Sequence, residues 1–337
     1  MNDILRKVES CSLFTGTYGR RGCTGNCIGC YTDMHMEHYP MYQGTVEQVY
    51  ELLSVLPNLK QVYIFGNPDP SVDPEFCNET AKILQSRGIE TLFVSNGVGG
   101  VEVVEKIIDG LNSSLIRGFG ISIDSLDEKT NSAMRGVKIS LQDIFQSIRH
   151  LKSLGINVKI FTTIWPTNVD ENWKEFVDFF ESRGIYTVCR FGHAEGVQGR
   201  IAHVPEKKIL EIRQNYGEVR LATLLANDEE YEEYLSSYVA NKEFRCTTFD
   251  NISVYFTEGE IKATYACPIL SHVYPEYLVN IHELKLHEFY DNLVKTGICP
   301  VSKQALGFES ETLHSICRFY KKLPKNKDLR RSETLSL

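Results

Sequence analysis

The strongest constraint on the fold is a repeating pattern, in which short runs of β-branched and aromatic residues alternate with longer segments of helical period. The runs that predict strands span residues 11–18, 61–66, 91–95, 116–124, 156–164 and 185–191. The segments that predict helices span residues 45–56, 76–88, 101–111, 140–155 and 172–184. Strands that are separated by single helices pair in parallel through right-handed crossovers. The first 191 residues therefore predict an α/β barrel, open or closed, with functional residues on the loops that follow the strands.

The charge and the apolar residues limit the partners of the chain. A formal net charge of −8 gives no overall basic field that would favour nucleic acid. There is no run of about 18 apolar residues that could span a membrane, and the first residues lead into no signal peptide. We therefore expect neither a membrane nor a nucleic-acid partner, and a cytoplasmic location. Thiols stay reduced there, so clustered cysteines indicate a metal site or catalysis rather than disulfides.

Three of the ten cysteines, Cys23, Cys27 and Cys30, lie within eight residues directly after the first predicted strand. Cys27 and Cys30 have the spacing of a zinc knuckle, but a closed structural zinc site needs four ligands. Three thiolates can instead hold a [4Fe-4S] cluster and leave one iron open to a substrate or cofactor. The spacing alone leaves both interpretations open, and we favour the cluster.

The spacing C-x3-C-x2-C after a first barrel strand resembles the signature of the radical S-adenosylmethionine (SAM) superfamily. The resemblance implies a partial (β/α)6 barrel of the TIM type, in which the open iron binds the amino and carboxylate groups of SAM. Family members usually carry an aromatic residue before the third cysteine. Here Gly29 has that place and Tyr31 follows the third cysteine, so Tyr31 is the aromatic residue expected to contact the cofactor.

The segment after the second strand, residues 66–74, resembles the Gly-Gly-Glu-Pro stretch of the family. Asn67 and Pro68 stand in the place of the glycines, and Asp69 stands in the place of the glutamate. Proline keeps its carbonyl oxygen, so the stretch can still accept a hydrogen bond from the SAM ammonium group. An ordinary loop rich in proline is the alternative.

The later strands carry further matches to SAM-binding positions. Ser95 and Asn96 at the end of the third strand are similar to the Thr-Asn-Gly turn of the family. Residues 121–136 resemble the Ser-x-Asp and Arg-Gly of members that carry additional clusters. This match includes Ser122, Asp124 and Arg135.

These matches imply roles for individual side chains. Ser122 would bind the ribose hydroxyls, and Arg135 would pair with the carboxylate of SAM, a contact suited to a guanidinium group. Asn168, after the fifth strand, matches a polar position near the ribose. Arg190, at the end of the sixth strand, is expected to make polar contacts in the site.

A second set of cysteines lies in the C-terminal part: Cys246, Cys267, Cys299 and Cys317. A predicted β-hairpin that turns at residues 258–259 separates the first two. Four thiolates complete a closed cluster site. The set resembles the short "twitch" form of the SPASM domain, a small α+β domain that binds one auxiliary [4Fe-4S] cluster. A zinc site with four cysteines is the alternative.

The expected domains are a radical SAM barrel at 1–200, a helical connector at 201–240, an auxiliary-cluster domain at 241–320 and a disordered tail at 321–337. No separate N-terminal domain for peptide recognition is expected, because the first strand begins near residue 11.

The resemblance also implies a reaction. An electron donor such as flavodoxin or ferredoxin would reduce the first cluster, and SAM would then be cleaved to a 5′-deoxyadenosyl radical that removes a hydrogen atom from the substrate. Relatives with these motifs mostly modify ribosomally made peptides, so we expect oxidative cross-linking or dehydrogenation of a peptide. Peptide epimerisation, or oxidation of a carbohydrate or aminocyclitol, is the alternative within the family. A zinc-stabilised binding module without catalysis is the alternative outside it.

Cys189 bears on the choice between oxidation and epimerisation. A thiol on the inner face of the sixth strand could return a hydrogen atom to a substrate radical, as epimerisation requires. Successive side chains on a strand point to opposite faces, so Cys189 and Arg190 cannot both face inward. We expect Arg190 to face inward and Cys189 to be buried behind the strand, which favours oxidation.

Overall fold

The computed structural model of the 337-residue chain describes residues 5–17, 23–28, 42–65, 69–191, 204–205, 207–208, 211–212, 244–246, 252–265, 278–284 and 320–322. At positions 7, 17, 190–191, 244–246, 265 and 320–322 it describes the backbone alone. Among the described helices, none has both the length and the apolar character needed to cross a membrane.

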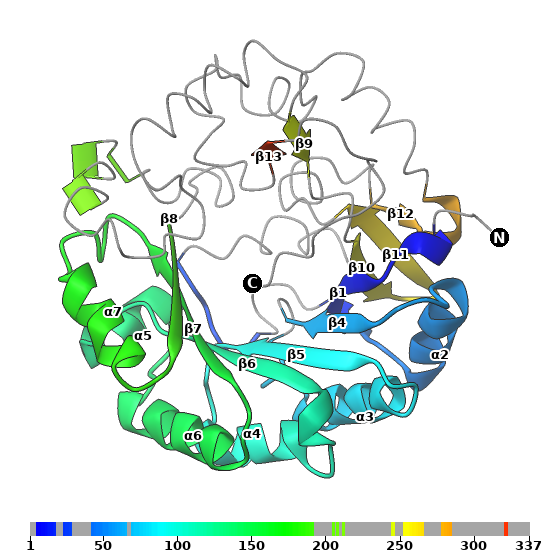
Figure 1. The fold of residues 1–337 in the computed structure, drawn as a ribbon, viewed down its shortest axis with the longest axis horizontal. Helices are drawn as coiled ribbons and strands as arrows, with labels where there is room; N and C mark the ends of the chain where they lie inside the picture. Colours follow the sequence, from blue (N-terminus) through cyan, green and yellow to red (C-terminus); the bar gives the residue numbers. More distant parts are fainter. Residues whose placement is uncertain are drawn as a thin grey trace.

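One sheet organises the described chain (Figure 1). Its strands are β1 (Ser10–Phe14), β4 (Gln61–Ile64), β5 (Glu90–Ser95), β6 (Ile116–Ser122), β7 (Val158–Ile164), β8 (Tyr186–Phe191), β10 (Ile252–Thr257), β11 (Glu260–Tyr265) and β12 (Val279–Asn280). The order across the sheet is β12-β11-β10-β1-β4-β5-β6-β7-β8. From β1 to β8 the neighbours pair in parallel. The predicted α/β fold with six parallel strands is confirmed.

The first predicted strand, residues 11–18, divides into two strands in the structure. The chain leaves the sheet after β1, and β2 (Gly16–Thr17) pairs instead with β3 (Tyr42–Gln43). The two segments are also joined by the Gly44 amide, which donates to the Thr15 carbonyl at 2.9 Å. A Cβ atom at Gly44 would lie 2.6 Å from that carbonyl oxygen, so the close approach requires glycine.

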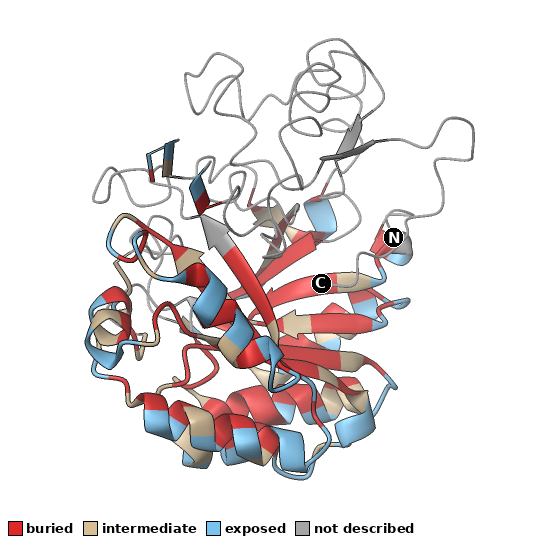
Figure 2. Cartoon of the chain, turned by 60° about the vertical axis from the view of Figure 1, so that its left-hand side comes forward, coloured by how far each residue is buried: buried red, intermediate tan, exposed pale blue. Residues whose placement is uncertain are grey.

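The helices surround the outer side of the sheet (Figure 1), and the helices that face the viewer in Figure 2 carry buried residues along one side and exposed residues along the other. They are α2 (Val46–Val55), α3 (Pro74–Gln85), α4 (Gly100–Ile108), α5 (Glu128–Arg135), α6 (Leu141–Ser153) and α7 (Trp173–Glu181). Side-chain oxygens cap their N-termini where the sequence offers them, as Ser140 does for α6 and Asn172 for α7. Gly155 and Gly184 follow α6 and α7 with φ of 73° and 65°, as expected for glycine after a helix end.

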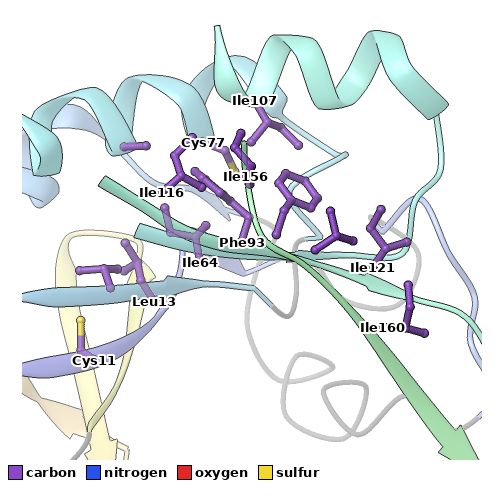
Figure 3. Close-up of a cluster of buried hydrophobic side chains, with 14 of the residues drawn as sticks. Cys11, Leu13, Ile64, Cys77, Phe93, Ile107, Ile116, Ile121, Ile156 and Ile160 are labelled. Carbon is purple, nitrogen blue, oxygen red and sulfur yellow. The ribbon is translucent and has the colours of Figure 1, made fainter. Parts of the chain in front are cut away.

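The hydrophobic core lies between the sheet and these helices (Figure 3). Leu13, Ile64 and Phe93 are neighbours across β1, β4 and β5, and all three are buried on the face that meets the helices. The residues before them, such as Ser12 and Tyr63, therefore belong to the opposite face, the inner side of the barrel. Apolar side chains on the outer face thus hold the barrel together and leave its inner face for other groups.

The hairpin formed by β10 and β11 belongs to the same sheet as the barrel strands. Thr257 pairs with Glu260, so the hairpin turns at residues 258–259 as predicted. β10 pairs in parallel with β1, which joins residues far apart in the sequence, such as Cys11 and Ile252. Gln48 on α2 secures the turn, because its Nε2 donates to the carbonyls of Thr257 at 2.9 Å and Glu260 at 3.0 Å. The division of the chain into domains at residues 200, 240 and 320 stays a prediction.

Candidate active site

Two of the predicted ligand cysteines lie in a segment at the carboxyl ends of the parallel strands. This segment, residues 23–28, is called the cysteine loop below. Cys23 and Cys27 are partly exposed. The loop contacts Ser71 after β4, Asn96 after β5 and the last turn of α5. It therefore lies where the fold class places functional residues.

The C-terminal end of α5 holds the cysteine loop through the backbone. The Asn26 amide donates to the Arg135 carbonyl at 2.8 Å, and the Ile28 amide donates to the Met134 carbonyl at 3.0 Å. Gly136 ends the helix with φ of 60°, and a Cβ atom there would lie 2.0 Å from the Asn26 oxygen. The Arg-Gly pair thus serves the loop geometry as well as the helix end.

A polar network joins the cysteine loop to the segments after β4 and β5. Asn96 Nδ2 donates to Thr24 Oγ1 at 2.9 Å, and Thr24 Oγ1 lies 2.7 Å from Ser71 Oγ. Ser71 Oγ and Ser95 Oγ donate to Asp69 Oδ1, at 2.7 and 2.8 Å. The backbone amides of Ser71 and Asn96 also donate to this carboxylate, at 2.9 and 2.7 Å. Asp69 thus accepts four hydrogen bonds and fixes residues that hold the loop.

Burial raises the pKa of Asp69 above the usual range of a carboxyl group, and the hydrogen bonds from Ser71, Ser95 and Asn96 oppose this rise. Both carboxylate oxygens are already occupied by donors of this chain. The side chain therefore positions the loop segments, and its contact with the cofactor stays a prediction.

Asp124 and Arg135 form a buried ion pair beside the cysteine loop. Asp124 Oδ2 lies 2.8 Å from Arg135 Nη2, and Asp124 Oδ1 accepts a 2.8 Å hydrogen bond from the Thr163 amide. Burial raises the pKa of Asp124, and the charge of Arg135 opposes that rise. Burial also acts to lower the pKa of Arg135, but Asp124 and Cys27 outweigh it, so the guanidinium group stays protonated. Arg135 Nη1 lies 4.0 Å from Cys27 Sγ.

Residues 19–180, which include this site, match the protein-family model described as "Radical SAM superfamily". This part of the chain belongs to the radical SAM superfamily. Membership implies a [4Fe-4S] cluster and SAM, and the conclusion agrees with the solved structures that share the fold.

Among those solved structures is Streptococcus suis SuiB bound to precursor peptide SuiA, with a TM-score of 0.56 and 15% identity. The match covers 92% of this chain and 70% of that chain. Another is native anSMEcpe with bound AdoMet and Cp18Cys peptide, with a TM-score of 0.53 and 11% identity, covering 92% of this chain and 88% of that one. At such low identity, these likenesses establish the fold alone.

The curated relatives include an AdoMet-dependent heme synthase of Nitratidesulfovibrio vulgaris, 24% identical over 192 residues, which are 55% of this chain and 51% of that protein. An AdoMet-dependent heme synthase of Methanosarcina barkeri is 21% identical over 156 residues, or 46% of this chain and 43% of that protein. The chain thus spans about half the length of the curated relatives it matches, or less.

The radical SAM site in this chain has groups that fit a thiolate-bound cluster and an anionic ligand. Cys23 and Cys27 supply sulfur donors, which suit iron. Within the described part of the chain, the buried Arg135 Nε has no hydrogen-bond partner. A buried guanidinium N–H without an acceptor fits a carboxylate.

Ser122 and Asn168, the two residues predicted to contact the nucleoside, differ in burial. Ser122 ends β6 and is partly exposed. Asn168 is buried, and its Nδ2 donates to the carbonyls of Asp124 at 2.7 Å and Thr163 at 3.1 Å. Its Oδ1 accepts from the Trp165 amide at 2.7 Å. Asn168 therefore shapes the backbone after β7, and its contact with the nucleoside stays a prediction.

Cys189 lies on the outer side of β8. It pairs with Thr162 in β7, on the same face as the core residue Ile160, and it is fully buried. Burial raises the pKa of its thiol to about 12. This placement disfavours the role of hydrogen donor, which stays a prediction, as does the role of Arg190, whose side chain lies outside the description.

The remaining predicted site residues lie outside the described residues. They are Cys30, Tyr31, Asn67, Pro68, Cys267, Cys299 and Cys317. Cys246 ends β9 (Phe244–Cys246), whose backbone pairs with β13 (Tyr320–Lys322), and nothing is described of its side chain. The predicted tail is likewise outside, apart from residues 321–322.

Sequence reasoning missed the residues that position the site. Thr24, Ser71 and Asn131 received no role, yet Asn131 Oδ1 accepts from the Asp124 amide at 2.9 Å, and the other two belong to the Asp69 network. A signal was present for Ser71, because an aspartate two residues earlier can accept from its amide in an Asx turn. No comparable pattern marks Asn131.

Proposed function

We propose that this chain cleaves SAM reductively and uses the resulting radical for the oxidative cross-linking or dehydrogenation of a ribosomally made peptide. The observation that carries the proposal is the cysteine loop, held at the carboxyl ends of the barrel strands beside a buried arginine. When bound, the cluster and SAM supply a 5′-deoxyadenosyl radical that removes a hydrogen atom from the substrate.

In this proposal the residues of the chain bind, orient and exclude water. Cys23, Cys27 and Cys30 hold the cluster. Arg135 binds the SAM carboxylate through Nε, which has no hydrogen-bond partner within the described part of the chain. Ser122 and the backbone near Asn168 contact the nucleoside. An electron donor such as flavodoxin or ferredoxin supplies the electron.

The test of this function is the release of 5′-deoxyadenosine by anaerobic, dithionite-reduced protein given SAM. We expect release from the wild type and none from Cys27→Ala. Cys11→Ala is the matched control, because Cys11 is buried on β1 away from the loop, and it should keep the activity. Equal release from wild type and Cys27→Ala would sink the assignment of the loop.

An auxiliary cluster held by Cys246, Cys267, Cys299 and Cys317 is part of the proposal. Reconstituted protein should then contain about eight irons, four for each cluster. A Cys246/Cys267/Cys299 triple alanine variant should retain about four. If that variant kept its full iron content, or if zinc replaced the iron, the auxiliary cluster would be abandoned.

Peptides are favoured as substrates because SuiB and anSMEcpe, which share the fold over most of this chain, were each solved with a peptide. The outward placement of Cys189 favours oxidation over epimerisation. A product made in deuterium oxide separates them: oxidation removes two hydrogens, whereas epimerisation adds one deuterium at a carbon. A carbohydrate or aminocyclitol as substrate would leave peptide candidates unmodified.

The curated relatives support a second candidate, a role in haem synthesis, because they are named AdoMet-dependent heme synthases. SAM-dependent formation of haem from an iron-containing tetrapyrrole, with no change in any peptide, would favour it over the first.

A further inference from the structure

Arg135 has a contact that its proposed role in binding SAM leaves unexplained. Its Nη1 lies 4.0 Å from Cys27 Sγ, at the outer limit of an N–H···S hydrogen bond. The same guanidinium group pairs with Asp124 through Nη2, at 2.8 Å. Nη1 and Nη2 thus have different partners, whereas Nε remains without one among the described residues.

The position of this guanidinium group is fixed from several sides. The backbone carbonyl of Arg135 accepts a hydrogen bond from the amide of Asn26, the residue before Cys27, at 2.8 Å. Asp124 is held in turn by Thr163 and Asn131. A shift of Arg135 relative to Cys27 would therefore break contacts on both sides, so the distance between the two is set by the fold.

The electrostatic consequence follows from burial. The Arg135 side chain is 13% exposed and the Asp124 side chain is 5% exposed, so the surrounding medium screens their charges weakly. Arginine stays protonated in proteins. Positive charge and N–H donors near the sulfurs of an iron–sulfur cluster favour its reduced, more negative state.

We propose that Arg135 is a positioning residue that acts through Cys27, by placing its guanidinium N–H beside the thiolate and raising the reduction potential of the cluster. The inference rests on the proposed function, since it requires the cysteine loop to hold a cluster. It adds a role for Arg135 that is present before SAM binds.

The experiment measures the midpoint potential of the cluster in wild-type protein and variants, without SAM. The signal followed is the one whose EPR spectrum changes when SAM is added to the wild type. Arg135→Gln should shift the midpoint to a more negative value by at least a tenfold change in the reduction equilibrium, about 59 mV for one electron. Arg135→Lys, which keeps the charge but loses the fork of donors, should shift it less.

Arg117→Gln provides the matched control. Arg117 lies near the start of β6, at the opposite end of the strand from Asp124, and pairs with Glu90 at 3.6 Å. This variant removes the same charge and should leave the potential unchanged. A merely structural role for Arg135 would lower iron content without moving the potential of the cluster that remains.

The inference is overturned if Arg135→Gln binds iron as the wild type does and has the wild-type potential. If Arg135→Gln fails to hold iron, Arg135→Lys decides: a lowered potential supports the inference and a wild-type potential overturns it. Wild-type protein that binds no iron would instead refute the proposed function.

Discussion

Replacing Gly136 with alanine would test how the cysteine loop is held to the barrel. Gly136 has φ of 60°, and an added Cβ would lie 2.0 Å from the carbonyl oxygen of Asn26 and 2.6 Å from its carbonyl carbon. Ordinary contacts between a carbon and an oxygen are about 3.3 Å or longer. Asn26 must therefore move by more than about 1 Å, which would break the hydrogen bonds that join the loop to Arg135 and Met134.

The expected loss of stability has two parts, the strained backbone conformation of the alanine and the two broken hydrogen bonds. The left-handed conformation costs an alanine about 1–2 kcal/mol. The two backbone hydrogen bonds contribute about 0.5–1.5 kcal/mol each, so Gly136→Ala should lower the free energy of unfolding by about 2–5 kcal/mol. Gly155→Ala is the matched control, because Gly155 has φ of 73° and its Cβ would meet nothing within 4 Å. It should incur the conformational cost alone.

The assay is urea unfolding of both variants, followed by circular dichroism, with iron content determined after reconstitution. Gly136→Ala should lose more stability than Gly155→Ala and should bind less iron, because Cys23 and Cys27 lie in the displaced loop. Equal losses of stability in the two variants, with equal iron, would refute the proposed attachment of the loop.

Three other outcomes follow from the same structure. Gln48→Ala removes two hydrogen bonds and should detach the turn of the β10–β11 hairpin from α2. The free energy of unfolding should fall by about 1–3 kcal/mol, and proteolysis at that turn should become faster. An unchanged rate of cleavage would contradict this. In cluster-free protein at pH 8, iodoacetamide should label Cys27 and spare Cys189, whose buried thiol has a pKa of about 12; equal labelling in native protein would contradict the placement of Cys189. The pKa of Asp69 is raised in the folded protein, so its contribution to stability is complete below the unfolded pKa of about 3.9 and declines as pH rises through the folded pKa. Asp69→Asn should flatten that decline. Parallel pH profiles of unfolding for the variant and the wild type would exclude the effect.

The strands and most helices could be predicted because each has a local signal. The run at residues 91–95 is β-branched and aromatic, and β5 spans Glu90–Ser95. The glycine at position 155 marks a helix end, and α6 stops at Ser153. Such signals depend on neighbours in the sequence, so they survive without any knowledge of the tertiary structure.

Long-range contacts gave no such signal. The hairpin at residues 252–265 was expected, but its parallel pairing with β1 joins residues about 240 positions apart, and periodicity does not specify a partner strand. The break after Phe14 was missed for the same reason, because it involves pairing with residues 42–43 and the hydrogen bond from Gly44 to Thr15.

The position of the cysteine loop could be predicted, because the spacing of Cys23 and Cys27 directly after the first strand suggests a site at the strand ends. The polar residues that fix the loop could not, because Thr24 and Ser71 lie in irregular segments where polar residues are ordinary. Their role appears once the carboxyl ends of β4 and β5 are adjacent, since this brings Ser71 and Asn96 to the same carboxylate.

The central claim, that the cysteine loop holds a cluster with an iron open to SAM, is tested most directly by EPR spectroscopy of the reduced protein with and without SAM. The claim predicts a [4Fe-4S] signal that changes when SAM is added, that is absent in Cys27→Ala and that is retained in Cys11→Ala. A spectrum that saturating SAM leaves unchanged, or protein that binds zinc and gives no iron–sulfur signal, would contradict it.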